Sequence, residues 1–417
     1  MFAFSGKHAI ITTEGDIMLR IFLMLALVGV IFSGCAPAPK FPEPTETKSS
    51  GTEPVTSTEP PLTSYTEAAT LPPETTVPEP DPILLMLESM TIEEKVGQLF
   101  LARCPETDAI GDIQKYHLGG YILFGRDFDG QTPDSRRQTI AGYQSAADIP
   151  LLIAVDEEGG TVCRVSNRKA FRSTRFPSPR DLFDQGGMDA ALDAEAEKSN
   201  LLAGLGINVN MAPVCDITTD PNAFMYKRSL GQTPEITGNF IAETVHTMED
   251  TGIGSVLKHF PGYGNNVDTH VGIAIDNRSL EELENCDLIP FKAGIDAGCD
   301  AILVSHTFVN ALDDVYPASL SPAVHGYIRE NMGFDGVIVT DDLGMQAITD
   351  QYGAGEAAVL AVLAGNDLLC STEYAIQYTA VLAAAQDGRI SSEALDQAVL
   401  RILRWKSHLG LFDPVEP

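Results

Sequence analysis

Positive charge is scarce in this sequence. The 417 residues include 27 Lys and Arg against 58 Asp and Glu, which gives a formal net charge of −31 at pH 7. A surface this acidic repels polyanions. The composition therefore argues against a nucleic acid or an acidic polymer as a partner held by general charge attraction. Any anionic substrate would have to be held by a local group of cations.

Cofactor and metal motifs are lacking as well. No GxGxxG or Walker-type loop follows the first candidate strand, so the sequence predicts no nucleotide cofactor and does not favour an open, doubly wound sheet. The cysteines form neither a CxxC motif nor a zinc-like spacing, and most lie in apolar runs. We interpret six of them as small core residues, with disulfide pairing as the alternative. These six are Cys104, Cys163, Cys215, Cys286, Cys299 and Cys370.

Large apolar side chains are almost absent between residues 36 and 80. This stretch consists mainly of Pro, Thr, Ser and Glu, and such a composition cannot bury enough surface to offset the entropy lost on ordering. We expect residues 36–80 to form a disordered tether that proline and repeated Glu keep extended. The folded domain is then expected to occupy residues 81–417.

A short apolar run precedes this tether. Residues 19–32 place one basic residue, Arg20, before a hydrophobic stretch that leads into Cys35. The pattern is typical of a secretory signal, here residues 1–35, and Met18 is a candidate translation start. Small residues directly before a cysteine resemble a bacterial lipobox. That resemblance implies cleavage before Cys35, a lipid on its thiol, and an exported protein anchored on the outer face of the cytoplasmic membrane or in the cell envelope. An uncleaved membrane anchor and ordinary secretion are the alternatives.

Beyond the tether, short apolar runs alternate with longer segments of helical composition. The candidate strands are residues 98–102, 120–124, 151–155, 208–211, 254–257, 301–304, 336–339 and 367–370. The clearest helical segments are residues 189–204, 233–251, 279–297, 322–332, 355–364 and 393–409. Alternating strands and helices indicate parallel βαβ units. Eight of them predict an α/β fold consisting of a single (β/α)8 TIM-type barrel.

Charged residues follow several of these strands directly. Asp156, Lys258, His306 and Asp341 each stand at or just after the end of an apolar run, and barrel enzymes carry their chemistry at the carboxyl ends of their strands. In the sequence VIVTDDLGM, Asp341 is followed at once by Asp342. Neighbouring residues at a strand end cannot face the same way, so we expect one carboxylate at the barrel mouth and the other in structural hydrogen bonds or a helix cap. The alternative is that both only cap.

A glycine-rich loop begins at Lys258 and His259 with the sequence KHFPGYGNNVDTH. Two Gly and a Pro within four residues break regular structure. Beyond them, Asp268 and His270 stand two residues apart, close enough for the carboxylate to orient the imidazole and to stabilise its protonated form. We therefore predict an acid/base dyad on a segment that moves when substrate binds.

A metal site is the alternative interpretation of the same histidines. It would bring together His259, His270, His306, Asp156 and Asp341, as in a metal-dependent amidohydrolase barrel. No His-x-His sequence follows the first candidate strand, however.

Asp156 also begins the segment DEEGGTVCR, which ends at Arg164. A carboxylate with nearby cations can bind adjacent sugar hydroxyls, because each hydroxyl donates to the acid and accepts from a cation. The candidates for the cationic side are Arg164, Arg228, Lys258 and His259. Each alone is equally compatible with a structural ion pair, but as a set they indicate a polyol pocket.

Taken in order, these motifs resemble glycoside hydrolase family 3, and within it the single-domain N-acetyl-β-glucosaminidases. The resemblance runs from MTIEEKVGQLF at residue 90 through the segments above, YPASLS and GFDG, to about residue 412. It implies that Asp341 is the nucleophile and that His270, supported by Asp268, is the acid/base. It also implies which residues hold the terminal sugar, namely Asp156, Arg164, Arg228, Lys258 and His259.

The resemblance implies a retaining, exo-acting enzyme that releases N-acetylglucosamine from peptidoglycan fragments or chitin oligosaccharides, with no cofactor and no metal. Family 3 β-glucosidases usually carry the acid/base as a carboxylate on a second domain, whereas an Asp-x-His loop is the signature of the N-acetylglucosaminidase branch. One departure is Tyr263, which stands where His is commonest and bears on aglycone preference or loop packing. The alternatives are a β-glucosidase or an N-acetylglucosaminide phosphorylase, and more distantly a metal-dependent hydrolase or a non-catalytic sugar-binding lipoprotein.

Overall fold

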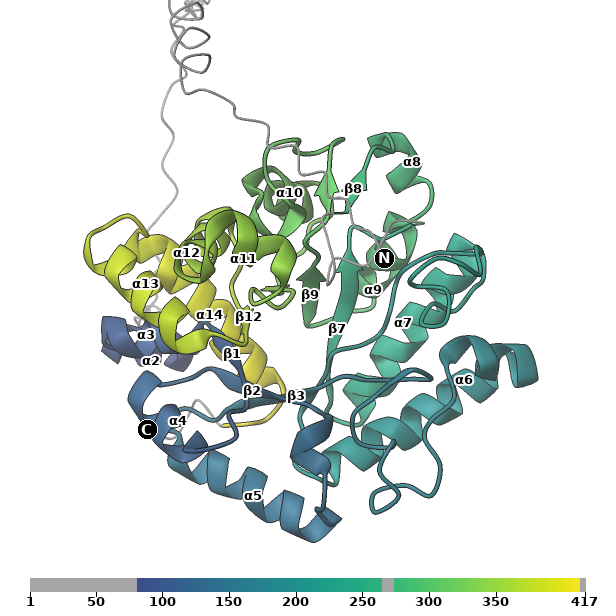
Figure 1. Cartoon of the computed structure of the whole chain (residues 1–417), viewed down its shortest axis with the longest axis horizontal. Coiled ribbons are helices and arrows are strands. Elements are labelled where there is room, and N and C mark those ends of the chain that lie inside the picture. The colour runs from purple at the N-terminus through teal and green to yellow at the C-terminus, as the bar shows by residue number, and fades with distance from the viewer. Residues whose placement is uncertain (1–80, 265–273, 413–417) are drawn as a thin grey trace, which may run out of the picture. The chain divides into compact units, whose positions relative to one another are not determined.

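The computed structural model of the chain describes residues 81–264 and 274–412, and within them eight parallel strands form a barrel (Figure 1). The strand order is β11-β9-β7-β6-β3-β2-β1-β12. A parallel bridge between Val339 and Leu368 joins β11 to β12 and closes the ring. The strands are β1 (Phe100–Arg103), β2 (Gly120–Leu123), β3 (Leu152–Val155), β6 (Val209–Asn210), β7 (Gly254–Phe260), β9 (Ala301–Val304), β11 (Val337–Thr340) and β12 (Leu369–Ser371).

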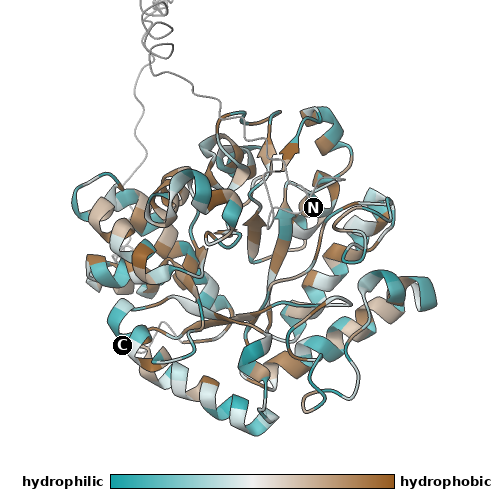
Figure 2. Ribbon diagram, viewed as in Figure 1, coloured by the Kyte–Doolittle hydropathy of each residue, from teal (hydrophilic) through white to brown (hydrophobic). Residues whose placement is uncertain are grey.

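The predicted barrel is therefore confirmed, and each predicted strand overlaps one of these eight. Parallel strands covered by helices are buried on both faces, so they appear in a sequence as continuous apolar runs. Figure 2 shows the hydrophobic residues along the strands and the hydrophilic ones on the outer helices. The first strand begins two residues later than expected. Residues up to Gln98 belong to a helix that Thr91 and Glu94 start with a capping box.

Helices surround the barrel in Figure 1. Those that follow the predicted segments most closely are α7 (Pro234–Asp250), α12 (Ala354–Ala364) and α14 (Ser392–His408). The others that cover the strands are α2 (Pro82–Ser89), α3 (Ile92–Gln98), α4 (Ala109–Tyr116), α5 (Pro133–Ala146), α6 (Pro179–Ala203), α11 (Gln346–Tyr352) and α13 (Tyr374–Gln386). Short extra elements lie at the strand ends, namely β4 (Glu157–Gly159), β5 (Val162–Cys163), β8 (Ile275–Asp276) and β10 (Phe308–Val309).

Three predicted helices were wrong in extent. The segment 189–204 is the second half of α6, which is bent where Gly186 and Gly187 leave helical geometry. The segment 322–332 is α10 (Pro322–Gly326) followed by a single π-helical turn.

The segment 279–297 is divided into α8 (Leu280–Glu284) and α9 (Leu288–Asp296). Between them the buried carboxylate of Asp287 accepts a hydrogen bond from Arg278 Nη1 at 2.5 Å. The same carboxylate lies so close to Gly262 that a Cβ there would be 2.5 Å from it. The break in the helix therefore places the Asp287 carboxylate against the glycine-rich loop. Helical periodicity in the sequence does not predict such a contact.

The cysteines of the described domain are unpaired, and all but Cys286 are buried. This confirms five of the six as small core residues. No helix within residues 81–264 and 274–412 is long and apolar enough to span a membrane. The predicted signal, Cys35 and the tether fall outside the described residues, and their boundaries stay predictions.

A buried lysine, Lys406, is expected to make the free energy of unfolding depend on pH. Lys406 has no exposed surface, and its Nζ lies 2.6 Å from Gln98 Oε1. Burial lowers the pKa of Lys406 to about 7. Between that value and the usual 10.5 the unfolded chain binds one more proton than the folded chain, so the free energy of unfolding rises with pH, by about 1.4 kcal/mol per unit.

Replacing Lys406 by Met should remove this slope. Between pH 7 and pH 9 the wild type should gain about 2 kcal/mol of unfolding free energy relative to Lys406→Met, as measured by urea denaturation. Lys292→Met is the control, because Lys292 is half exposed and pairs with Asp296 at the surface. Equal pH slopes for wild type and Lys406→Met would contradict the prediction.

Candidate active site

A cavity of about 560 Å³ lies at the carboxyl ends of the barrel strands. Asp156 directly follows β3, Lys258 and His259 belong to the end of β7, and Asp341 directly follows β11. All four line the cavity, together with Arg164 and Arg228. The closed barrel thus brings together six of the residues that the sequence analysis selected, although they lie far apart in the chain.

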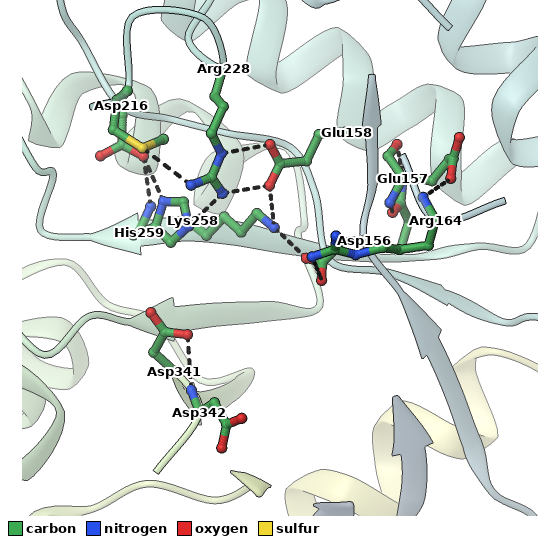
Figure 3. Close-up of polar contacts among 12 residues, drawn as sticks. Asp156, Glu157, Glu158, Arg164, Asp216, Arg228, Lys258, His259, Asp341 and Asp342 are labelled. Atoms are coloured by element: carbon green, nitrogen blue, oxygen red, sulfur yellow. Dashed lines mark hydrogen bonds and ion pairs between the residues drawn. The ribbon is translucent and has the colours of Figure 1, made fainter. Parts of the chain in front are cut away.

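Lys258 is at the centre of a buried ionic network (Figure 3). Its Nζ lies 2.8 Å from Asp156 Oδ1 and 2.6 Å from Glu158 Oε1. Burial by itself would lower the pKa of Lys258, but the two carboxylates outweigh burial and raise it. Lys258 is therefore a fixed positive charge that holds Asp156 at the cavity wall.

Glu158 joins Lys258 to Arg228. The guanidinium of Arg228 donates from Nε to Oε2 at 2.9 Å and from Nη2 to Oε1 at 2.6 Å, the two-pronged geometry that makes such pairs strong. Burial alone would raise the pKa of Glu158, whose side chain is 1% exposed, but Arg228 and Lys258 hold that pKa well below its usual range. One carboxylate thus fixes two cations that border the cavity.

The imidazole of His259 is fixed on both nitrogens. Its Nε2 lies 3.0 Å from Arg228 Nη2, and its Nδ1 lies 2.8 Å from Asp216 Oδ2. A guanidinium has donors only, so Nε2 accepts, and the ring proton resides on Nδ1 and is donated to Asp216. Asp216 also accepts from the backbone N–H groups of His259 and Tyr263, at 3.1 and 2.7 Å. His259 is therefore a neutral, oriented group rather than a cation.

The three successive acids after β3 have different roles. Asp156 faces the cavity, where Arg164 Nη2 lies 3.5 Å from its Oδ2. Glu157 is fully buried and accepts from the backbone N–H groups of Arg164 and Val165 at 2.8 and 2.7 Å. Glu157 therefore holds the hairpin that carries Arg164. Glu158 instead points to Lys258 and Arg228.

The two acids after β11 also differ. Asp342 accepts from the backbone N–H of Gly344 at 2.8 Å and of Thr372 at 3.0 Å, and from the Thr372 hydroxyl. Asp341 accepts from the backbone N–H of Asp342 at 2.9 Å and lines the cavity. Asp342 thus ties the end of β11 to the residue after β12, while Asp341 is the carboxylate that this tie holds at the barrel mouth.

Tyr263 packs into the wall of the same cavity. Its ring is 1% exposed and meets His259 edge-on, with centroids 5.3 Å apart and planes at 81°. The Phe224 ring also meets the Tyr263 ring edge-on, with the two centroids 5.7 Å apart. The residue that departs from the commonest form of this loop therefore buttresses His259.

The structure does not place every predicted residue at this cavity. Asp268 and His270, the predicted dyad, fall outside the described residues. His306 is buried, with Nδ1 2.7 Å from Ser319 Oγ and Nε2 3.0 Å from the Asp342 carbonyl oxygen. In the part of the chain that the structure describes, no three His, Cys, Asp or Glu side chains are arranged to hold a metal ion.

Sequence reasoning missed Glu158 and Asp216. Glu158 stands in the quoted segment DEEGGTVCR, but nothing in a linear sequence says which of three adjacent acids turns inward. The short antiparallel pairing of β4 with β5 contains a register shift between Glu157 and Gly159. This irregularity, rather than simple alternation, sets which way each acid points.

Comparison with known proteins gives a consistent result. A model of the glycosyl hydrolase family 3 N-terminal domain matches residues 91–405. The Beta-hexosaminidase LpqI of Mycobacterium tuberculosis is 31% identical over 326 residues, which cover 75% of this chain and 82% of that protein. A Beta-hexosaminidase of Stenotrophomonas maltophilia is 36% identical over 306 residues, 68% of this chain and 87% of that one.

Among solved structures, a glycoside hydrolase family 3 β-N-acetylglucosaminidase from a Paenibacillus species superposes with a TM-score of 0.73 and 36% identity. The match covers 78% of this chain and 63% of that one. The Paenibacillus structure thus has the same barrel and a further part that this match does not cover.

Proposed function

The chain belongs to glycoside hydrolase family 3 and is a glycoside hydrolase, and on that basis we propose that it is a retaining, exo-acting β-N-acetylglucosaminidase. The names of its relatives support the choice of sugar. The observation that carries the proposal is that Asp341, Asp156, Lys258 and Arg228 line one cavity, with Glu158 joining the two cations.

The network is suited to hold a terminal sugar. Asp156 accepts hydrogen bonds, while Lys258, Arg228 and Arg164 donate them, so adjacent hydroxyls can each donate to the acid and accept from a cation. The neutral His259 adds a ring fixed between Arg228 and Asp216. These groups are held before substrate arrives, so little ordering is needed on binding.

The proposed chemistry is a double displacement. An Asp341 oxygen forms a bond to the anomeric carbon while the bond to the leaving oxygen breaks and His270 gives that oxygen a proton. Water then attacks the anomeric carbon of the glycosyl-aspartate, gives its proton to His270, and releases Asp341. Two inversions retain the configuration. Asp268 orients the imidazole of His270.

A histidine suits this acid/base role next to a carboxylate nucleophile. A second carboxylate close to Asp341 would raise the pKa of the nucleophile by repulsion, whereas neutral imidazole adds no negative charge. The same absence of negative charge would let an anionic acceptor such as phosphate approach. The test of the function must therefore distinguish hydrolysis from phosphorolysis.

The substrate and the location complete the proposal. The sugar comes from peptidoglycan fragments or chitin oligosaccharides, and the protein acts outside the cytoplasm, anchored by a lipid on Cys35 through the tether of residues 36–80. The support is the sequence pattern of residues 1–80.

The 4-nitrophenyl β-glycosides of N-acetylglucosamine and glucose test this function. We expect kcat/KM to favour the N-acetyl substrate at least about tenfold, with no effect of a chelator, because a site that hydrogen-bonds a substituent discriminates against the analogue that lacks it. Acceleration by inorganic phosphate would identify a phosphorylase instead. A preference for the glucoside would contradict the N-acetylglucosaminidase assignment.

A further inference from the structure

The proposed chemistry gives no role to His306, after β9, or to the motif YPASLS at residues 316–321. The fold brings these two features together. The side chain of His306 is 1% exposed, and its Nδ1 lies 2.7 Å from the hydroxyl oxygen of Ser319, which is buried within the motif. Buried polar groups are normally hydrogen-bonded. The partner of the second ring nitrogen connects His306 to the nucleophile.

That second nitrogen, Nε2, lies 3.0 Å from the backbone carbonyl oxygen of Asp342. A carbonyl oxygen only accepts, so Nε2 carries a proton and donates it. In the neutral ring Nδ1 then accepts from the Ser319 hydroxyl. Ser319 is itself fixed, because its backbone N–H donates to the Ser305 carbonyl at 3.0 Å and its carbonyl accepts from Asn366 Nδ2 at 2.8 Å. The imidazole is therefore held with its Nε2–H directed at Asp342.

Asp342 is also held by its side chain. Its carboxylate accepts from the backbone N–H groups of Gly344 and Thr372 at 2.8 and 3.0 Å. With the carbonyl held by His306 as well, two substituents of the Asp342 Cα are fixed. Tetrahedral geometry then fixes the place of the third, the backbone nitrogen. The N–H on that nitrogen donates to Asp341 Oδ1 at 2.9 Å (Figure 3).

This last hydrogen bond acts on the nucleophile directly. It restrains one oxygen of the Asp341 carboxylate and leaves the other for the bond to the anomeric carbon. The backbone N–H of Asp341 donates to the Val304 carbonyl at 3.0 Å, but that bond holds the backbone rather than the carboxylate. The orientation of the Asp341 carboxylate is thus linked, through Asp342, to His306.

We propose that His306 is a positioning residue for the nucleophile. Through the Asp342 carbonyl it keeps the Asp342 N–H on Asp341 Oδ1, and so holds the carboxylate in the orientation from which it bonds to the anomeric carbon. Ser319 supports His306 by keeping the ring proton on Nε2. The inference rests on the proposed glycosidase function. His306 acts through Asp342 and exchanges no proton with substrate.

Two amide variants separate the two hydrogen bonds of His306. The side-chain nitrogen of Gln reaches about as far as Nε2 of an imidazole, so His306→Gln keeps a donor for the Asp342 carbonyl. That of Asn reaches only as far as Nδ1, so His306→Asn reaches Ser319 but not Asp342. His325→Asn is the control. His325 is also buried, and its Nδ1 lies 2.8 Å from the Ser321 carbonyl oxygen, but it belongs to α10.

His306→Asn should lower kcat on 4-nitrophenyl N-acetyl-β-glucosaminide by about tenfold to a hundredfold, because an error of about 1 Å in the placement of a reacting group has that effect. The competitive Ki of free N-acetylglucosamine should change by less than about threefold, since Asp156, Lys258 and Arg228 bind the sugar without His306. His306→Gln should recover most of the lost kcat. Ser319→Ala should lower kcat by a smaller factor than His306→Asn, again with Ki retained.

A kcat of His306→Asn within about twofold of the wild type would overturn the inference and leave the glycosidase function intact. A Ki that rises as much as kcat falls would overturn it too, and so would an equal loss of kcat in His306→Gln or His325→Asn, because each would indicate general loosening of the barrel. If His306→Asn does not fold, the kcat and Ki of Ser319→Ala decide in the same way. A wild type that cleaves no β-glycoside would overturn the proposed function, and this inference with it.

Discussion

Asp341→Ala is expected to lower kcat on 4-nitrophenyl N-acetyl-β-glucosaminide by a factor of about 10⁴ or more. Asp341 lines the cavity directly after β11, and its backbone N–H donates to the Val304 carbonyl at 3.0 Å, so the strand ladder fixes its position. Without its carboxylate no glycosyl-enzyme can form, and the variant retains only what binding and proton transfer supply.

Asp342 provides the matched comparison. Asp342→Asn keeps an oxygen that can accept from Gly344 and Thr372, so its kcat should fall far less than that of Asp341→Ala. A slowly hydrolysed substrate should add the mass of one sugar to the peptide that contains Asp341. Loss of activity in Asp342→Asn with retention in Asp341→Ala would move the nucleophile to the neighbouring residue.

Glu158→Ala is expected to lower the free energy of unfolding at pH 7 by about 3–5 kcal/mol, because it leaves buried cations without their shared carboxylate. Lys258 and Glu158 are 2% and 1% exposed, and Arg228 is 12% exposed. With Asp156 as the remaining acid of the network, Lys258 and Arg228 would repel each other. The same variant should raise KM, since Arg228 and Lys258 lose the positions from which they bind hydroxyls.

The pH dependence of this effect follows from the pKa of Glu158. Arg228 and Lys258 hold that pKa below the usual 4.5 against the opposing effect of burial, so the folded state favours the charged form. The stabilisation is fully present above pH 4.5 and is lost as the pH falls below it, where the unfolded chain takes up a proton first. The stability difference between wild type and Glu158→Gln should therefore shrink as acid is added.

Glu197→Gln is the control for this measurement. Glu197 also pairs with an arginine, Arg172, but its side chain is 57% exposed, and such pairs contribute about 1 kcal/mol or less. Urea unfolding at pH 7 and at pH 4 gives both comparisons. A loss at Glu158 no larger than that at Glu197 would show that the network does not stabilise the fold.

The strands were the most predictable part of the fold. Each is short and apolar, because a barrel strand is covered on both faces, and turn residues or charges end it. The helices were less predictable where tertiary demands interrupted them. Residues 279–297 have helical composition throughout, yet the chain breaks near Asp287 so that this carboxylate meets Arg278 and Gly262.

The candidate site was predictable as a set of residues rather than as a geometry. Asp156, Lys258, His259 and Asp341 follow apolar runs, and that position is readable in one dimension. Which acids pair, and with which cation, is not. Glu158 lies two residues after Asp156 in the sequence. The two acids share Lys258 only because a single strand, β6, separates β3 from β7 in the closed barrel.

The sequence by itself determined the fold class, the family and six of the residues that border the cavity, because each depends on local order along the chain: alternating apolar runs, motifs in series, and charges at strand ends. The tertiary structure alone decided that Asp342 is a structural acid, that His259 is neutral and that Glu158 joins two cations. These properties depend on which side chains from distant strands meet in a buried, low-dielectric space, and closure of the barrel sets those meetings.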